Sequence, residues 1–319
     1  MLRALFISLS KARWAQRLIT NWKFAWRLAS RFIAGETIQD AMRALEQLNA
    51  MGIRATLDQL GENTESQAAA NQSTADILAA LDAIHEAELP ANVSIKLSQL
   101  GLLLDPELAY ANLVTILERA RSHANFVRVD MEDSTLTEIT LNLVQRAISA
   151  GFDNVGTVIQ SYLYRSAEDT RLLAQAGIRV RVVKGAYKEP ASVAFPKKMD
   201  VDSTFDQLVE TLLQAEQAIG SPGGSADGRF PPLTAVGSHD PARIKFAQDK
   251  AAELGLPKQS VEFQLLYGIR RDLQQDLVKA GYPVRVYVPY GTHWYPYYMR
   301  RLAEHPANVW FFISIFFKK

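Results

Sequence analysis

Short runs of apolar and β-branched residues alternate along this chain with longer segments in which apolar residues recur at helical spacing. The apolar runs predict eight strands, which start near Ile53, Asn92, Asn125, Asn154, Ile178, Leu233, Ser260 and Pro283. The segments between them predict helices, and three of these segments begin with common capping residues, Asp105, Ser134 and Ser166. Regular alternation of strand and helix predicts a closed parallel barrel, so the expected fold class is α/β, a (β/α)8 TIM-type barrel with extra N-terminal helices.

The length of the patterned region bears on the domain organisation. A barrel of this type needs about 250 residues, and residues 53 to 304 supply that length. We expect residues 1–52 to form a helical segment that packs on the barrel, and residues 53–319 to form the barrel with a C-terminal helix. The Gly-, Pro- and Ser-rich stretch 220–232 predicts a long surface loop. A doubly wound fold is the weaker alternative, because LDQLGENT after the first strand is not a Gly-rich phosphate turn.

The first 35 residues carry seven basic side chains and no acidic one. Large apolar residues recur every four positions there, at Trp14, Leu18, Trp22 and Trp26, and basic residues line an adjacent face, at Lys23, Arg27 and Arg31. This pattern predicts a basic amphipathic helix. Such a helix either caps the barrel, which we favour, or lies on an anionic membrane surface. The aromatic tail VWFFISIFFKK from Val309 is too short to span a membrane. Without a signal peptide pattern, we expect a cytoplasmic protein, with peripheral contact at the inner membrane left open.

Composition narrows the classes of function. The 319 residues are 48% hydrophobic and 22% charged, which is typical of a globular chain with a large core. A net charge of +1 gives no whole-chain attraction to nucleic acid. Because the chain has no cysteine, disulfides, thiolate metal sites and cysteine nucleophiles are excluded. The five histidines show no ligand spacing, so no metal site is expected.

Polar residues follow or end almost every predicted strand, where barrels of this type keep their chemistry. They are Asp58, Lys96, Asp130, Gln160, Arg181 with Lys184, His239, Gln264 and Tyr287. Each has a structural interpretation as a helix cap or a satisfied core group, but together they predict an active site. One candidate chemistry is a Schiff-base aldolase with Lys184 as the nucleophile. A cofactor held across the barrel mouth is another, and a noncatalytic binding barrel is the third.

A pair of arginines stands near the end of the chain, in the helix-patterned segment WYPYYMRRLAE that starts at Trp294. Arg300 and Arg301 either belong to a solvated helix face or clamp a small anion, because a guanidinium matches the geometry of a carboxylate. Tyr297 and Glu304 lie three to four residues away along the helix, where an aromatic shield and an orienting acid could share one face with the pair.

In their order along the chain, the motifs ATLDQLGE, SIKLSQLG, VRVDMED, VIQSYLYR, RVRVVKGAYKE, SHD, EFQLLYGI and RVYVPYGTHWYPYYMRRLAE resemble those of the proline dehydrogenases. The resemblance runs from about Phe32 to the arginine pair and implies a flavin-dependent (β/α)8 enzyme of proline catabolism. It also accounts for the missing G-x-G-x-x-G motif, because this family binds FAD on a barrel. The length resembles that of the single-function bacterial enzymes.

The resemblance implies a substrate site in which Arg300, Arg301 and Lys96 hold the proline carboxylate. Asp130 and Tyr287 would line the proline ring. The remaining substrate positions are expected nearby, at Ala186, Tyr187, Leu266, Tyr297 and Glu304.

For the cofactor, the resemblance implies that FAD is held by Asp130, Gln160, Arg181, Val183, Lys184, Gly185, Ala186, His239 and Gln264. Arg181 would lie beside the reactive part of the ring system, and Lys184 and His239 towards the phosphates and ribityl chain. The implied reaction is hydride transfer from C5 of L-proline to N5 of FAD, with Δ1-pyrroline-5-carboxylate as product. The implied electron acceptor is a quinone, so the protein would at least visit a membrane surface.

Overall fold

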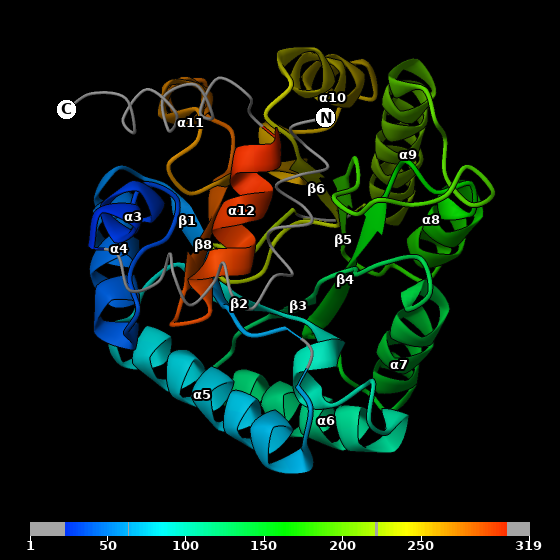
Figure 1. The fold of residues 1–319 in the computed structure, drawn as a ribbon. Coiled ribbons are helices and arrows are strands. Elements are labelled where there is room, and N and C mark those ends of the chain that lie inside the picture. The colour runs from blue at the N-terminus through cyan, green and yellow to red at the C-terminus, as the bar shows by residue number, and fades with distance from the viewer. Residues whose placement is uncertain (1–22, 63, 221–222, 305–319) are drawn as a thin grey trace.

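Eight parallel strands close into a barrel in the computed structural model, which describes residues 23–62, 64–220 and 223–304 (Figure 1). Each strand pairs with its neighbours in sequence, and β1 closes the barrel against β8. The strands are β1 (Arg54–Gln59), β2 (Ala91–Ile95), β3 (Val127–Val129), β4 (Val155–Gln160), β5 (Val180–Val183), β6 (Thr234–Gly237), β7 (Val261–Leu266) and β8 (Val284–Tyr290). The predicted (β/α)8 barrel is therefore confirmed.

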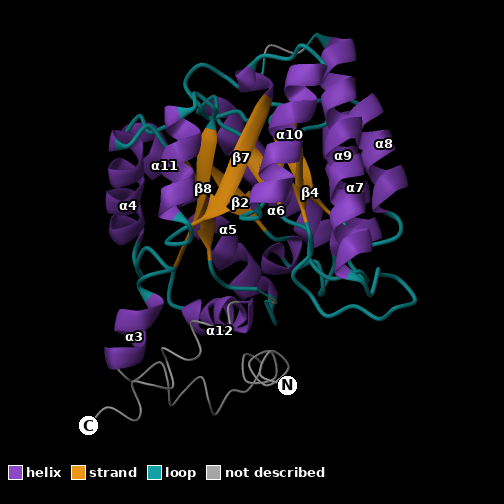
Figure 2. Cartoon of the chain, turned by 90° about the horizontal axis from the view of Figure 1, so that it is seen from above, coloured by secondary structure: helices purple, strands orange, loops and turns teal. Residues whose placement is uncertain are grey.

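Most of the helices surround the barrel on the outside, and α3 and α12 lie at one end of it (Figure 2). The helices are α3 (Lys23–Ala29), α4 (Ile38–Ala50), α5 (Gln67–Glu86), α6 (Pro106–Ser122), α7 (Thr137–Ser149), α8 (Ser166–Gln175), α9 (Lys198–Ile219), α10 (Pro241–Glu253), α11 (Arg271–Lys279) and α12 (Trp294–Glu304), with short 3-10 turns η1 (Leu97–Leu100) and η2 (Lys258–Ser260). The main core lies between strands and helices, where residues such as Val93, Leu113 and Leu212 are buried. Because successive side chains of a strand alternate in direction, the other set points into the barrel.

The helix caps agree with the sequence pattern in one case of three. Asp105 caps α6, with its side chain accepting a hydrogen bond from the Glu107 N–H at 3.0 Å. The other two predicted caps are wrong. Ser134 precedes α7 by three residues and bonds Glu189 instead, and Ser166 lies inside α8, where its hydroxyl donates to the Gln160 carbonyl at 2.5 Å.

The Gly- and Pro-rich segment 220–232 is not simply a surface loop, which corrects the sequence-based expectation. Its described part closes the N-terminal end of the barrel: Arg285 Nη2 donates to the Gly228 carbonyl at 2.6 Å, and Asn92 Nδ2 donates to the Arg229 carbonyl at 2.8 Å. The Phe230 ring packs 5.7 Å from the ring of Phe126. This segment therefore supplies carbonyl groups to side chains inside the barrel at its N-terminal end.

The final helix α12 lies across the end of the barrel at which the strands terminate (Figures 1 and 2). Helix α3 packs against it, with the rings of Trp26 and Trp294 5.4 Å apart. Trp294 is buried, and its Nε1 donates to Glu36 at 3.0 Å. Two expected segments, the leader up to Trp22 and the tail from Val309, lie outside the described residues. The division at residue 52 stays a prediction.

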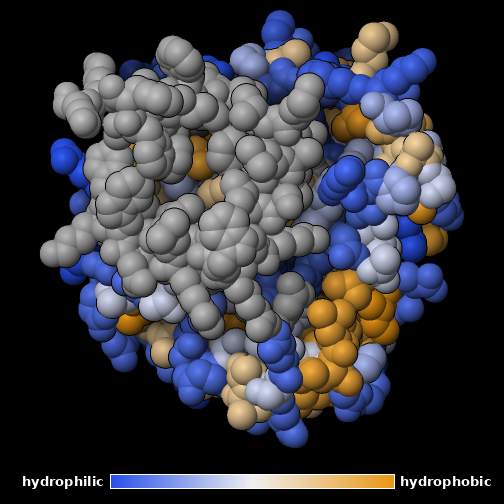
Figure 3. Space-filling view, in the orientation of Figure 1, coloured by the Kyte–Doolittle hydropathy of each residue, from blue (hydrophilic) through white to orange (hydrophobic). Residues whose placement is uncertain are grey.

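The face seen in Figure 1 is mostly hydrophilic over its helices, with a hydrophobic patch at lower right (Figure 3). Leu103 and Leu104, between η1 and α6, are among the exposed large apolar side chains. Within the described part of the chain, every helix is too short or too polar to cross a membrane.

Candidate active site

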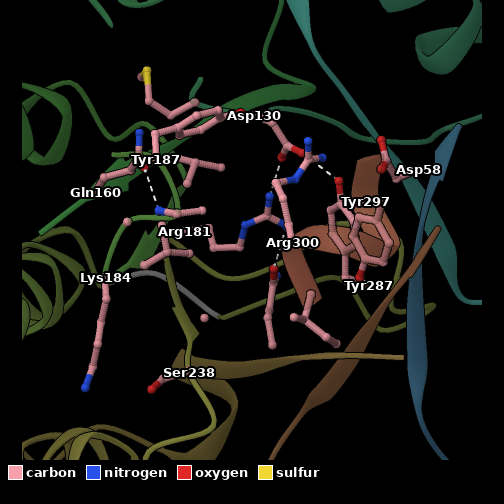
Figure 4. A pocket seen from close by; sticks show the side chains of 18 of the residues that line it. Asp58, Asp130, Gln160, Arg181, Lys184, Tyr187, Ser238, Tyr287, Tyr297 and Arg300 are labelled. Atoms are coloured by element: carbon pink, nitrogen blue, oxygen red, sulfur yellow. Dashed lines mark hydrogen bonds and ion pairs between the residues drawn. The ribbon is translucent and has the colours of Figure 1, made fainter. Parts of the chain in front are cut away.

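A cavity of about 360 Å³ opens at the C-terminal end of the barrel, below α12 (Figure 4). The strands and the loops that follow them supply most of its lining, and α12 supplies the rest. All predicted site residues whose side chains are described line this cavity, namely Lys96, Asp130, Gln160, Arg181, Val183, Lys184, Gly185, Ala186, Tyr187, His239, Gln264, Leu266, Tyr287, Tyr297, Arg300 and Arg301. The Glu304 side chain lies outside the described part.

Lys96 forms the centre of a buried polar cluster where β1, β2 and β3 end, next to Tyr287 of β8. Its ammonium donates to Asp58 at 3.1 Å, to Asp130 at 3.3 Å and to the Tyr287 hydroxyl at 3.2 Å. The Tyr287 hydroxyl in turn donates to Asp130 at 2.7 Å. Because an ammonium has only three N–H groups, an additional carboxylate can bind Lys96 only by replacing one of these partners.

Burial and opposite charges act against each other in this cluster. Burial alone would raise the pKa of Asp130, but Arg181 and Lys96 outweigh it and hold that pKa at about 2. At Asp58 burial dominates and raises the pKa to about 6. Burial also opposes a charge on Lys96, yet Asp58 and the other anionic groups around it hold its pKa well above the ordinary value. Near neutral pH the cluster therefore contains a carboxylate at Asp130 and an ammonium at Lys96.

Arg181, on β5, connects this cluster to the opposite wall of the cavity. Its Nη2 pairs with Asp130, and its Nη1 donates to Oε1 of Gln264 at 3.2 Å. The guanidinium carbon also lies 5.2 Å from the centre of the Tyr287 ring. These contacts from three strands fix a planar cation in the cavity wall.

Gln160 and Gly185 shape the wall next to Arg181. Gln160 Nε2 donates to the Glu132 carbonyl at 2.7 Å, and Gln160 Oε1 accepts from the Ala186 N–H at 3.4 Å. Gly185 has a φ of +123°, and a Cβ there would come within 2.4 Å of the Tyr162 ring. The resemblance placed this glycine among the residues that would hold the cofactor. The structure adds a backbone conformation and a packing contact that both require glycine.

Lys184 points away from Arg181 and Arg300 (Figure 4). Its ammonium pairs with Asp202 at 2.6 Å and with Asp240 at 2.7 Å. The two ion pairs occupy the Lys184 ammonium and hold it away from Arg181 and Arg300. The geometry therefore disfavours the Schiff-base alternative for Lys184.

Arg300 and Arg301 reach the cavity from α12. Arg300 forms a two-point ion pair with Glu62, with nitrogen–oxygen distances of 2.8 and 3.2 Å. Arg301 is buried, and its guanidinium carbon lies 5.0 Å from the centre of the Tyr297 ring. An incoming carboxylate would therefore compete with Glu62 for Arg300.

Sequence reasoning missed six lining residues, Glu62, Met131, Val158, Gly237, Ser238 and Leu265. Glu62 is the important one because it forms an ion pair with Arg300, which was predicted to bind the substrate. Its signal was a carboxylate three residues beyond the end of β1, at the end of the barrel where chemistry gathers. Only the tertiary structure shows that this carboxylate meets Arg300, since 238 residues separate the two along the chain.

The cavity suits a flavin by its donors and by its bare backbone. The amides of Gln160 and Gln264 and the guanidinium of Arg181 present groups that can hydrogen-bond the ring nitrogens and carbonyl oxygens of such a cofactor. Gly185 and Gly237 leave the wall free of side chains at two places, and a Cβ at Gly237 would come within 2.7 Å of Val183. These features fit a flat, polar cofactor.

Several known proteins resemble this chain in sequence or in fold. The family model for proline dehydrogenase matches residues 41–313. The chain is 42% identical over 322 residues to proline dehydrogenase 1 of Bacillus subtilis strain 168, covering 100% of both chains. It is 41% identical to a proline dehydrogenase of Deinococcus radiodurans, covering 91% of this chain and 90% of that protein. Among solved structures, proline utilization A (PutA) from Bdellovibrio bacteriovorus shares the fold, with a TM-score of 0.79 and 24% identity over 88% of this chain and 33% of that one. The chain belongs to the proline dehydrogenase family.

Proposed function

We propose that this protein oxidises L-proline to Δ1-pyrroline-5-carboxylate in the cavity below α12, with FAD as its cofactor. Bound FAD would supply the hydride acceptor, N5, for the hydrogen on C5 of proline. The observation that carries the proposal is the convergence of Lys96, Asp130, Tyr287 and the arginine pair on one cavity, in a chain of this family.

The arginine pair would bind the proline carboxylate. A guanidinium forms two parallel hydrogen bonds to a carboxylate, as Arg300 does with Glu62 here. Substrate would replace Glu62 at Arg300 and approach Arg301 from the same cavity. Lys96 could join only by releasing Asp58, Asp130 or Tyr287.

The rest of the cluster would orient the ring. Tyr287 and Asp130 are fixed by Lys96 and Arg181, so the ring would meet a rigid wall. A fixed wall matters because a small displacement of the reacting carbon lowers the rate strongly. For the cofactor, Gln160, Arg181 and Gln264 would contact the ring system. Lys184, His239 and the neighbouring backbone would lie along its chain, and a phosphate there would compete with Asp202 and Asp240 for Lys184.

We further propose that a quinone reoxidises the cofactor and that the protein is cytoplasmic, with the basic leader touching the inner membrane. Deleting residues 1–22 tests this while retaining Trp26, which packs on Trp294 of α12. The deletion should lower activity with a membrane-bound quinone and preserve activity with a soluble one. Equal activity with both acceptors would remove the leader from this role.

The deciding experiment for the reaction is an anaerobic visible spectrum of the purified protein as L-proline is added. We expect a yellow protein whose flavin bands bleach with L-proline and stay unchanged with D-proline. A protein that stays colourless after FAD is supplied would contradict the proposed cofactor. Trapping of a carbonyl substrate by borohydride would instead support the Schiff-base alternative.

A further inference from the structure

Glu262, a charged residue with no role in the proposed reaction, lies inside the barrel one layer below the cavity. Glu262 and Gln264 are two positions apart on β7, so both side chains point inwards. Glu262 is completely buried. Gln264 Nε2 donates to Glu262 Oε1 at 2.7 Å, which links this carboxylate directly to a residue of the cavity wall.

This contact determines which way the Gln264 amide faces. An ionised carboxylate can only accept hydrogen bonds, whereas an amide has one donor end and one acceptor end. The donor end of Gln264 must therefore face Glu262. Its oxygen faces the cavity side, where it accepts a hydrogen bond from Arg181 at 3.2 Å. If the amide were reversed, oxygen would face oxygen on one side and N–H groups would face each other on the other.

Glu262 itself is held firmly and stays ionised. Arg285 pairs with both of its oxygens, at 2.7 and 3.1 Å, and Arg54 Nη1 lies 3.2 Å from Oε2. Arg285 is anchored in turn by the carbonyls of Ala55 and Gly228 at 2.7 and 2.6 Å. Burial alone would raise the pKa of Glu262, but Arg285 and Arg54 outweigh it and hold that pKa below the ordinary value.

The contacts form a continuous series from the bottom of the barrel to the cavity. Arg285 fixes Glu262, Glu262 fixes the amide of Gln264, and Gln264 holds one arm of Arg181. The other arm of Arg181 pairs with Asp130, towards which it points in Figure 4. Arg181 thus has one carboxylate in direct contact and a second that acts through an amide.

We propose that Glu262 is a positioning residue for the cofactor, because it sets the orientation of the Gln264 amide and through it the position of Arg181. The proposal rests on the proposed function, which assigns Gln264 and Arg181 to the flavin. Glu262 itself would contact neither cofactor nor substrate. Its role is to give the cavity wall a single arrangement of donors and acceptors.

The test is the variant Glu262→Gln, studied as the FAD-loaded full chain. Glutamine has the shape of glutamate but can present either a donor or an acceptor to Gln264, so the amide loses its unique orientation. We expect the dissociation constant of FAD to rise about tenfold, which corresponds to one hydrogen bond to a charged group. We also expect shifted absorption maxima of the bound flavin and a lower kcat with little change in KM for proline.

A matched control separates positioning from stability. Arg54→Met removes a cation from the same carboxylate but leaves the contact between Glu262 and Gln264 intact. This variant should unfold at a lower temperature and keep the wild-type FAD affinity and flavin spectrum. If Glu262→Gln does not fold, the double variant Glu262→Gln/Arg285→Gln removes both charges together and serves in its place.

Two results would overturn the inference. One is a Glu262→Gln protein with wild-type FAD affinity and flavin spectrum. The other is an Arg54→Met protein that changes both as much as Glu262→Gln does, which would make the effect one of stability alone. Failure of the proposed function is a separate result, because it would appear in the wild-type protein as an inability to bind FAD or to be bleached by L-proline.

Discussion

Asp58 is the residue of the buried cluster whose charge changes closest to neutral pH. Burial raises its pKa to about 6, against an ordinary value of 3.8. Between these two pH values the native state binds more protons than the unfolded chain, so the free energy of unfolding falls as pH rises through this window. Asp130 behaves in the opposite sense. Its pKa of about 2 lies below the ordinary 3.8, so the ionised Asp130 stabilises the fold at pH values above 3.8. This contribution is lost as the pH falls from 3.8 to about 2.

The variant Asp58→Asn should remove the decrease in the free energy of unfolding that Asp58 causes as the pH rises. Losing one partner of Lys96 adds an offset that does not depend on pH, because Asp130 and Tyr287 keep the ammonium charged. Relative to wild type, the variant should gain up to about 3 kcal/mol in free energy of unfolding as pH rises from 4 to 7. Urea unfolding at several pH values measures this difference. Parallel stability curves for the two proteins would show that Asp58 has an ordinary pKa.

Arg301 is the residue on which substrate binding should depend most directly. We expect Arg301→Lys to raise KM for proline at least tenfold, because an ammonium cannot form the paired hydrogen bonds of a guanidinium. The control is Arg146→Lys, which alters an exposed two-point pair with Glu107 far from the cavity. Half-saturation by proline at the wild-type concentration in Arg301→Lys would remove this residue from the carboxylate site.

At the scale of elements, the connection from β5 to α9 owes its path to Gly185. Its φ of +123° is unfavourable for other residues, and a Cβ would meet Tyr162 at 2.4 Å. We expect Gly185→Ala to displace this connection and raise the dissociation constant of FAD about tenfold or more. Gly220→Ala is the matched control, since Gly220 also has a positive φ, of +66°, but nothing lies within 4 Å of a Cβ there. If both variants bind FAD equally, the contact with Tyr162 has no influence on the cavity.

Helix α12 depends on its contacts with the N-terminal segment around α3 and Glu36 for its position over the cavity. Trp294 Nε1 donates to Glu36 at 3.0 Å, so Trp294→Phe should lower the free energy of unfolding by about 1–3 kcal/mol. The same change should raise KM for proline, because the arginine pair is on this helix. Glu36→Gln keeps an acceptor for the indole and should have a smaller effect. Thermal unfolding and initial-rate kinetics measure both variants, and equal losses would show that the hydrogen bond is not what holds the helix.

At the scale of the whole molecule, cofactor binding should stabilise the barrel, since the cavity is lined from every side. With FAD at one hundred times its dissociation constant, the stabilisation is about 2.7 kcal/mol, equivalent to roughly 4 °C in Tm for a chain of this size. Riboflavin, which keeps the ribityl chain but lacks the phosphates expected near Lys184 and His239, should give a smaller shift at equal concentration. An unchanged Tm with FAD would contradict a cofactor site in this cavity.

The pattern of apolar and polar residues along the chain was enough to predict the barrel, the order of its strands and most of the cavity lining. Strand alternation is local, and a parallel barrel brings all strand ends to one face, so Asp130, Gln160 and Gln264 could be assigned to a common site. Membership of the proline dehydrogenase family was recognisable from the motifs, which are also local features of the sequence. The roles given to these residues within the site stay predictions.

Tertiary structure alone decided the partners of these groups. The pairing of Glu62 with Arg300, the sharing of Lys96 between two carboxylates and the series from Arg285 to Arg181 all join residues distant in sequence. The predicted caps at Ser134 and Ser166 were wrong, and the predicted loop at 220–232 lies only partly at the surface, for a related reason. Buried polar groups must find partners wherever the closed barrel places them, and local sequence pattern contains no information on which partners those are.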